Sequence, residues 1–309
     1  MFEEHALRAT DFAFFANDSF MRADEESRRS DVPIEKLVKI TDDIYIQKMP
    51  KGVWEMVADS CTLSGVVNAT RQFSQLYAFV REFDKCPEGH DRTVWDNDER
   101  LQICIGLSRI IHPTTISFGY SGRTLWEGEK IIEVISGPAT GFGARAWVSS
   151  DEWRNWLTAD DARELSALAR AFFRPDSQLC TRVKQSLWYL EYAYRTEFLD
   201  IRWPLVCMGL ECLIHTDKWN STLQFKKRVS KMAEQVGVQD FPENKAEEAY
   251  DMRCALAHGK LLRDMGQTKQ KLYEKAEDVL RLAIKRAILE PPYNLMFSNN
   301  EIIRECFPL

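Results

Sequence analysis

The sequence predicts a mainly α-helical protein in which a C-terminal antiparallel helical bundle follows a mixed α/β N-terminal region. Three observations support this fold class. Apolar residues recur every three or four positions in five segments between residues 178 and 289, which is the spacing of one helix face. Short β-prone segments separated by glycines lie between residues 115 and 148. The 309 residues, 45% of them hydrophobic, suffice for two ordinary domains with buried cores.

The composition indicates a soluble protein of a reducing compartment, and we expect it to be cytoplasmic. No apolar run reaches the roughly 18 residues that a membrane-spanning helix needs, and the start Met1-Phe-Glu-Glu-His lacks the features of a signal peptide. The eight cysteines are too sparse for a disulfide scaffold and include no CxxC pair. Residues 177–309 carry 20 basic and 18 acidic side chains, whereas residues 1–176 carry 21 and 29. A nucleic-acid partner would therefore contact the C-terminal half.

The N-terminal half is expected to contain a lead-in and one mixed α/β domain. Residues 1–35 are polar and charged and form the lead-in, which Phe12 and its neighbouring phenylalanines could anchor. The domain spans 36–175. Its expected elements are a strand at 40–47, a helix at 54–83 with a break at Gly65, a loop at 86–98, a helix at 99–111, strands at 115–120, 130–135 and 144–148, and a helix at 150–173 capped by Ser150. Arg174-Pro175-Asp176 marks the boundary to the third region, 176–309.

Five helices are expected in residues 176–309, and the short loops between them predict an antiparallel bundle. They span 178–199, 203–214, 223–236, 245–258 and 270–289. The first places Leu179, Val183, Leu187, Leu190, Tyr194 and Phe198 on one face. The second is apolar almost throughout, so it is expected at the centre of the bundle. The fourth has Asn244 as its expected N-cap and ends at Gly259, a residue type suited to the C′ position.

The helix expected at 223–236 separates apolar from basic side chains. Phe225, Val229 and Met232 lie on one side. The other side carries four basic residues, Lys226, Lys227, Arg228 and Lys231. Two interpretations of these four stay open: a solvated helix face, or a surface that binds RNA phosphates.

The helix expected at 245–258 carries Tyr250-Asp-Met-Arg-Cys-Ala-Leu-Ala-His-Gly259, in which Arg253 and His258 are five residues apart. The apolar helix before it contains Glu211, and the basic helix lies between the two. Over residues 178–290 this pattern resembles the HEPN family of RNA-directed domains, in its Apea-like branch. HEPN domains are bundles of four or five helices with an Arg-x4-6-His motif near the end of a late helix. One position departs from the pattern, because Cys254 stands where catalytic members often carry Asn, Asp or His.

The resemblance implies a metal-independent endoribonuclease that acts on RNA as a homodimer without a cofactor, and in the family such proteins serve toxin, defence or RNA-processing roles. It implies catalytic roles for Arg253 and His258. An imidazole titrates near neutrality and transfers protons, and a planar guanidinium matches two oxygens of a phosphorane. Glu211 could orient either residue, and Asp251 is a further catalytic candidate.

The same residues also allow a non-catalytic interpretation. Arg253 and Glu211 could form a structural ion pair between two helices, and His258 could cap the helix C-terminus, where a cation is favoured. The bundle would then be a HEPN module that binds RNA, a nucleotide or a protein partner. Cys254 favours this alternative, whereas the intact Arg253 and His258 favour the enzyme.

Other motifs favour structural roles. Cys86 and His90 have a spacing that zinc could use, but no second pair of ligands lies nearby, so no metal site is expected. The glycine-rich segment 137–143 lacks the GK[ST] ending of a phosphate-binding loop and is expected to be a turn between strands. Trp147, Trp153 and Trp156 are expected to pack in a core.

Overall fold

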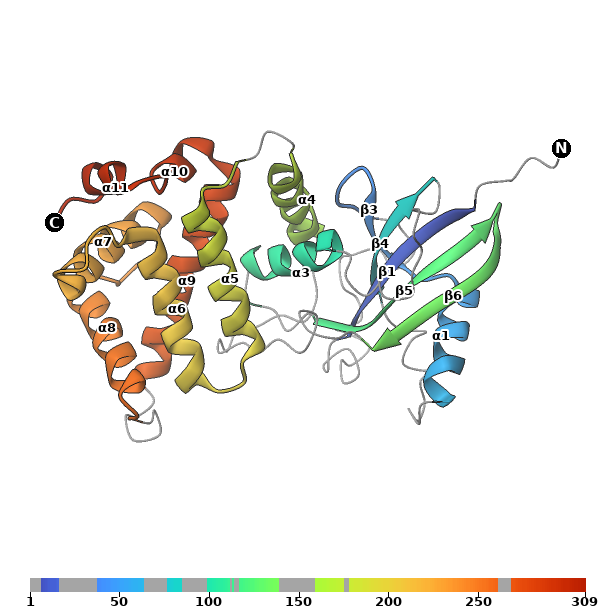
Figure 1. The fold of residues 1–309 in the computed structure, drawn as a ribbon, viewed down its shortest axis with the longest axis horizontal. Helices are drawn as coiled ribbons and strands as arrows, with labels where there is room; N and C mark the ends of the chain where they lie inside the picture. The colour runs from blue at the N-terminus through green and yellow to red at the C-terminus, as the bar shows by residue number, and fades with distance from the viewer. Residues whose placement is uncertain are drawn as a thin grey trace. The chain divides into compact units, whose positions relative to one another are not determined.

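The computed structural model describes residues 7–16, 38–63, 77–84, 99–111, 113, 117–138, 159–174, 178–260 and 268–309. The chain divides into two compact units (Figure 1). Unit 1 comprises Met1–Arg145 and Arg154–Arg170, and unit 2 comprises Ala146–Trp153 and Ala171–Leu309. An antiparallel sheet lies in unit 1 and helices make up the described part of unit 2. The protein is therefore mainly helical with an N-terminal sheet, which confirms the coarse fold class.

The sheet orders its described strands as β2-β3-β4-β1-β5-β6, and every neighbouring pair is antiparallel. The strands are β1 (Arg8–Ala16), β2 (Val38–Lys39), β3 (Ile44–Lys48), β4 (Tyr77–Phe83), β5 (Ser117–Glu127) and β6 (Lys130–Pro138). β1 pairs with β4 on one side and β5 on the other, so residues 8–16 form an inner strand of the sheet and not a polar lead-in. The cause is alternation along the strand: Phe12 enters the apolar core, while Asp11 on the other face pairs with Arg123 of β5.

Residues 77–83 form β4, which corrects the helix predicted over 54–83. The aromatic and apolar residues at 77, 80 and 83 repeat every three positions and so imitate a helix face. Both faces of β4 are covered in the fold: Ala78 and Val80 belong to the core cluster that contains Phe12, and Phe79 is buried on the opposite face. A strand buried on both faces loses the polar alternation that identifies strands.

Helices complete the core of unit 1. α1 (Lys51–Leu63) packs Val53, Val57 and Ala58 against Phe12 of the sheet, and Figure 1 shows it beside β6. A Cβ on Gly122 of β5 would lie 2.7 Å from the Phe12 ring, so this position keeps β5 close to the core. α3 (Glu99–Ile111) confirms the helix predicted at those residues. α4 (Ala159–Phe173) covers the later part of the helix predicted at 150–173.

Some predictions fall outside the described residues. These are the loop at 86–98, the strand at 144–148, the helix start at 150–158, the tryptophans 147, 153 and 156, and the pair Cys86 and His90. The segment 137–143 is described only at its start, where Gly137 and Pro138 are the last residues of β6. The region expected at 40–47 contains β3, but Ile40 and the three residues after it form the bend between β2 and β3.

Unit 2 is a bundle of five long helices followed by two short ones in its described part (Figure 1). The helices are α5 (Thr181–Arg195), α6 (Leu199–Ile214), α7 (Ser221–Val236), α8 (Glu243–Ala257), α9 (Thr268–Leu289), α10 (Pro291–Leu295) and α11 (Asn300–Cys306). α6 packs against α5, α7, α8 and α9, which confirms its central position. Among these helices and the described helices of unit 1, none has the length and apolar character to cross a membrane.

Two local predictions in unit 2 need correction. Phe198 was expected on the buried face of the first helix, but 65% of its surface is exposed, because α5 ends at Arg195 and Phe198 is the N-cap position of α6. Asn244 was expected to cap α8. The helix starts two residues earlier than expected, at Glu243, so Pro242 is the N-cap and provides no side-chain hydrogen bond.

Candidate functional site

Glu211 of α6 and Arg253 of α8 meet where these two helices pack. Nη2 of Arg253 lies 3.2 Å from Oε2 of Glu211, and 30% of the arginine side chain and 14% of the glutamate side chain are exposed. Burial lowers the pKa of Arg253, but the Glu211 carboxylate together with Cys254 and Tyr250 outweighs burial, and the pKa is raised. The ion pair expected as a clamp between helices is therefore present. It leaves part of the arginine side chain exposed to solvent.

His215 is a member of this cluster that the sequence did not reveal. It is the C-cap of α6, and its Nδ1 lies 4.0 Å from Oε1 of Glu211, one helical turn earlier. Its Nε2 is buried and has no hydrogen-bond partner among the described residues. Burial lowers the pKa of His215; Glu211 opposes this shift, and the cations Arg228 and Arg253 add to it. His215 is therefore a mainly neutral side chain near pH 7, and it lies beside the Glu211 carboxylate.

His258 lies at the other end of the motif, exposed at the C-cap of α8. The N–H of Gly259 donates to the carbonyl of Leu256 at 3.0 Å, and the N–H of Lys260 donates to the carbonyl of Ala255 at 3.1 Å. Together with the φ of +87° at Gly259, these bonds form a Schellman motif. The motif fixes the backbone of His258, and Gly259 is the C′ residue that was predicted.

The structure separates the sequence candidates of α8 onto different sides of the helix. Five residues correspond to about 140° of rotation, so Arg253 and His258 of one chain do not share a face. Asp251 is two residues from Arg253, which corresponds to about 200°. It is exposed and has no hydrogen-bond or ion-pair partner among the described residues. Of the four catalytic candidates, only Glu211 and Arg253 are in contact.

The four basic residues of α7 do not form one exposed surface. Arg228 is only 1% exposed, which corrects its assignment to the basic face. Its guanidinium donates to the carbonyls of Phe307 at 2.8 Å and Ile214 at 2.7 Å. Position 228 borders the apolar face, and a long side chain from there reaches carbonyls left free where α6 ends. Arg228 therefore ties α7 to α6 and to the chain after α11.

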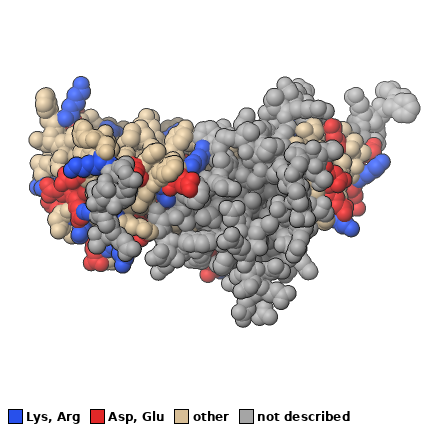
Figure 2. Space-filling view, turned by 90° about the horizontal axis from the view of Figure 1, so that it is seen from below, with Lys and Arg blue, Asp and Glu red and all other residues tan. Residues whose placement is uncertain are grey.

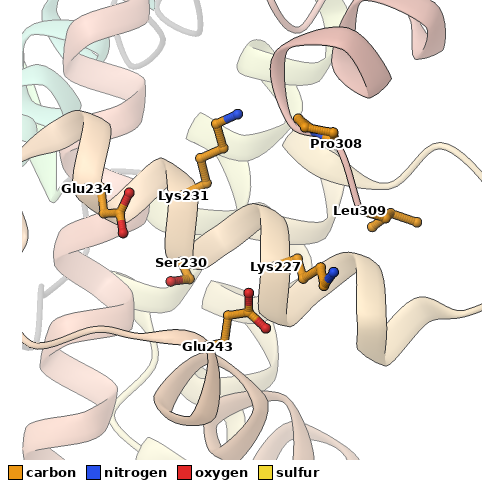
Figure 3. A pocket seen from close by; sticks show the side chains of 7 residues that line it. All are labelled: Lys227, Ser230, Lys231, Glu234, Glu243, Pro308 and Leu309. Atoms are coloured by element: carbon orange, nitrogen blue, oxygen red, sulfur yellow. The ribbon is translucent and has the colours of Figure 1, made fainter.

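The three lysines of α7 differ in their surroundings. Nζ of Lys226 lies 3.1 Å from Oε1 of Glu247 of α8. Lys227 and Lys231 have no ion-pair partner within the described part of the chain and line an open pocket of about 340 Å³ (Figure 3). The other lining residues are Ser230, Glu234, Glu243, Pro308 and Leu309. Two cations and two carboxylates share this pocket, so it is not a strongly basic site.

The surface of unit 2 is mixed in charge. Figure 2 shows Lys and Arg side chains interspersed with Asp and Glu side chains over the described residues of the bundle on that face. The composition of 177–309, with 20 basic and 18 acidic residues, agrees with this picture. A nucleic acid on this face would thus meet separate cations and not one continuous basic field.

Two kinds of group among the described residues bear on metal and nucleophilic chemistry: possible metal ligands and the buried thiol of Cys207. No group of three or more His, Cys, Asp or Glu side chains there is arranged to hold a metal ion. Cys207 is buried beside the Glu211–Arg253 pair, and burial raises the pKa of its thiol well above the usual range. Cys207 is therefore a small core residue and not a nucleophile.

Comparison with known proteins gives no match for this chain: no family model matches it, and neither a curated protein nor a solved structure is significantly similar to it. The HEPN resemblance therefore rests on the motif residues of α6 and α8.

Proposed function

We propose that unit 2 is a metal-independent endoribonuclease of the HEPN type that acts as a homodimer. The observation that carries this proposal is the state of Arg253. Its guanidinium is held by the Glu211 carboxylate, and part of the side chain stays in solvent. The helix that carries it ends in His258, which is exposed and held by a rigid backbone motif. An anchored cation and a free imidazole are the two groups that phosphodiester cleavage needs.

The reaction needs no nucleophile from the protein. A base removes the proton of the RNA 2′-hydroxyl, and the 2′-oxygen attacks the adjacent phosphorus. The bond from phosphorus to the 5′-oxygen breaks, and an acid donates a proton to that oxygen. The products are a 2′,3′-cyclic phosphate and a 5′-hydroxyl. His258 accepts the proton of the 2′-hydroxyl and, as the imidazolium, donates a proton to the 5′-oxygen, and Arg253 stabilises the charge that gathers on the phosphorane oxygens.

The placement of the two residues on α8 favours a site shared by two chains. About 140° of helix rotation separates Arg253 from His258, so a phosphate at one of them is turned away from the other in the same chain. In a two-fold symmetric dimer, a residue of one chain can face a different residue of its partner, and the reverse contact then forms as well. Arg253 of one protomer and His258 of its partner can then act on the same phosphate.

A non-catalytic RNA-binding module is the second candidate, and two observations favour it. Glu211 already occupies one edge of the Arg253 guanidinium. Cys254, beside Arg253, provides no polar group comparable to the Asn, Asp or His often found there in catalytic members. In this case Arg253 would bind a phosphate without catalysis, and His258 would cap α8.

The cleavage dependence on His258 separates the two candidates. The purified 309-residue chain is incubated with labelled RNA in EDTA, and His258→Ala is compared with Asn244→Ala, an exposed change on the same helix. Loss of a general acid or base should slow cleavage roughly 100- to 10,000-fold. We expect 2′,3′-cyclic phosphate ends from the wild type and from Asn244→Ala only. Equal cleavage by all three proteins, or none by the wild type, would favour the binding module.

A further inference from the structure

The loop between α6 and α7, residues His215 to Asn220, presents an unusual side chain. Trp219 is 81% exposed, the largest exposed fraction among the large hydrophobic residues that the structure describes. Its sequence neighbours Asp217, Lys218 and Asn220 are polar and exposed. The indole is therefore flanked by polar side chains in the loop and does not belong to an apolar run of the sequence.

The exposure of Trp219 does not come from a loosely held loop. Gln224, which is buried, donates from Nε2 to the carbonyl of Trp219 at 2.7 Å and to that of Asp217 at 3.0 Å. The Oε1 of Gln224 accepts the N–H of Thr216 at 3.0 Å. Arg228 donates to Oε1 of Gln224 at 2.8 Å and fixes that side chain in turn. One buried amide thus holds three successive parts of the loop.

Helix α11 anchors the same loop from a second direction. Nδ2 of Asn300 donates to the carbonyl of Thr216 at 3.0 Å. Nη2 of Arg304 lies 2.7 Å from Oδ1 of Asp217. The backbone that carries Trp219 is therefore fixed by side chains from α7 and α11, and the exposed indole projects from this fixed platform.

Both ends of the loop touch the candidate site. His215, at its start, lies 4.0 Å from the Glu211 carboxylate that binds Arg253. Ser221, directly after the loop, lies close enough to the Tyr250 side chain to oppose the rise in pKa that burial gives that hydroxyl. The Arg253 guanidinium carbon lies 5.7 Å from the centre of the Tyr250 ring. The platform is thus attached at both ends to the cluster that holds Arg253.

We propose that Trp219 stacks on a base of single-stranded RNA whose neighbouring phosphate lies at Arg253. This inference rests on the proposed function and names its substrate: an unpaired nucleotide. A single aromatic ring on a fixed backbone with polar neighbours suits a base, because stacking needs one flat face and the phosphate and ribose beside it need polar contacts. A protein partner would bury a contiguous apolar area, which the neighbours of Trp219 do not offer.

Binding of an uncleavable RNA tests this inference separately from catalysis. The probe is a short, fully 2′-O-methylated single strand with a fluorescent label, and its affinity is measured by anisotropy for the full-length chain. Trp219→Ala should weaken binding by about 10- to 100-fold, because base stacking has that strength in single-strand binding proteins. Trp219→Phe keeps a ring and should lose far less. Phe198→Ala, a matched change at another exposed aromatic residue, should bind as the wild type does.

Two further measurements separate stacking from a structural role. The same sequence as a blunt duplex, whose bases are paired, should bind Trp219→Ala and the wild type equally. Wild-type affinity of Trp219→Ala for the single strand, together with weak binding by Arg253→Ala, would overturn the stacking inference and leave the proposed function standing. If the wild type does not bind the single strand, or if Arg253→Ala binds it as the wild type does, the proposed function fails and the stacking role fails with it.

Discussion

Arg253 is the residue on which the proposed chemistry depends. Glu211 occupies one of its N–H donors and also fixes the position of its side chain. A guanidinium has five N–H donors, and the contact at 3.2 Å occupies one of them. The remaining donors suffice for a two-point contact with a phosphate. Because the carboxylate also fixes the side chain, Arg253 loses less conformational freedom when a phosphate binds.

Two residues of the site region show where sequence reasoning stops. His215 precedes Arg253 by 38 positions and follows Glu211 by four, so only the packing of α6 on α8 reveals that the three belong together. Arg228 follows two lysines directly in the sequence of α7, so the local pattern predicts a surface residue. Its partners, the carbonyls of Ile214 and Phe307, are remote in the sequence, and no local pattern points to them.

The lowered pKa of His215 predicts a pH dependence of stability. In the unfolded chain this imidazole takes up its proton as the pH falls through about 6.5, while in the folded chain it stays neutral to a lower pH. The unfolded state therefore binds more protons there, and the free energy of unfolding decreases as the pH falls below that value. Between about pH 7.5 and pH 5.5, denaturant titration should show a larger loss for the wild type than for His215→Gln. Equal losses in the two proteins would contradict this role of burial.

At the scale of elements, the sequence predicts the bundle well and the sheet less well. α7 and α9 show long apolar periodicity on one side, and α6 is apolar almost throughout, so local spacing was sufficient. The prediction missed β4 because this strand is buried on both faces, and it missed β1 because polar and charged residues precede and follow Phe12, which enters the core. Both strands owe their conformation to partners that pair with them from distant parts of the chain.

The glycines that follow α7 and α8 offer a matched pair of variants. Gly259 has a φ of +87° after α8, and Gly237 has a φ of +79° after α7. Alanine at either position should lower the free energy of unfolding by about 1 kcal/mol, because L-residues are strained in this region. Only Gly259→Ala should also slow RNA cleavage beyond its effect on stability, since it moves His258. Equal cleavage rates for the two variants at matched folded fractions would mean that the position of His258 is unimportant.

The contact among α5, α6 and α9 contains a buried polar network whose loss should be severe. Tyr194 Oη donates to Oε1 of Glu277 at 3.0 Å, and Nη2 of Arg202 lies 3.5 Å from Oε2. Burial raises the pKa of Glu277. Arg202, Tyr273 and Tyr194 act in the opposite direction but do not cancel this rise. Glu277→Ala leaves a buried arginine without its carboxylate and should cost about 3–5 kcal/mol of stability in denaturant titration. Glu305→Ala, an exposed change, should stay within about 0.5 kcal/mol; similar small losses for both would show that the network is not needed.

At the scale of the whole molecule, charge restricts how RNA can bind. The net charge is −6, and the basic and acidic residues of the bundle are nearly balanced. Long-range attraction is therefore weak, and in the proposed complex affinity would come from a few local contacts such as Arg253, Lys227 and Lys231. The composition of the two halves favours the C-terminal half for the proposed RNA contact, but it could not show that Lys226 and Arg228 are already engaged with other groups of the protein.

The salt dependence of binding should report these few contacts. For a single strand, each phosphate contact contributes about −0.7 to the slope of log affinity against log salt. Lys231→Ala should reduce the magnitude of the slope by about this amount, because Lys231 has no ion-pair partner among the described residues. Lys226→Ala should change it less, since Lys226 is paired with Glu247. A larger change of slope for Lys226→Ala than for Lys231→Ala would mean that Lys231 does not contact an RNA phosphate.

In the proposed dimer, Arg253 of one protomer and His258 of its partner form one site, and this arrangement can be tested with mixed dimers. Arg253→Ala and His258→Ala chains are co-expressed with different tags, and dimers that carry both tags are purified and assayed for cleavage in EDTA. If Arg253 and His258 act across the two-fold axis, one of the two sites in each mixed dimer is intact, and cleavage returns to about half the wild-type rate. If both residues act within one chain, or if the bundle only binds RNA, each mixed dimer stays as inactive as its parents, and the account is contradicted.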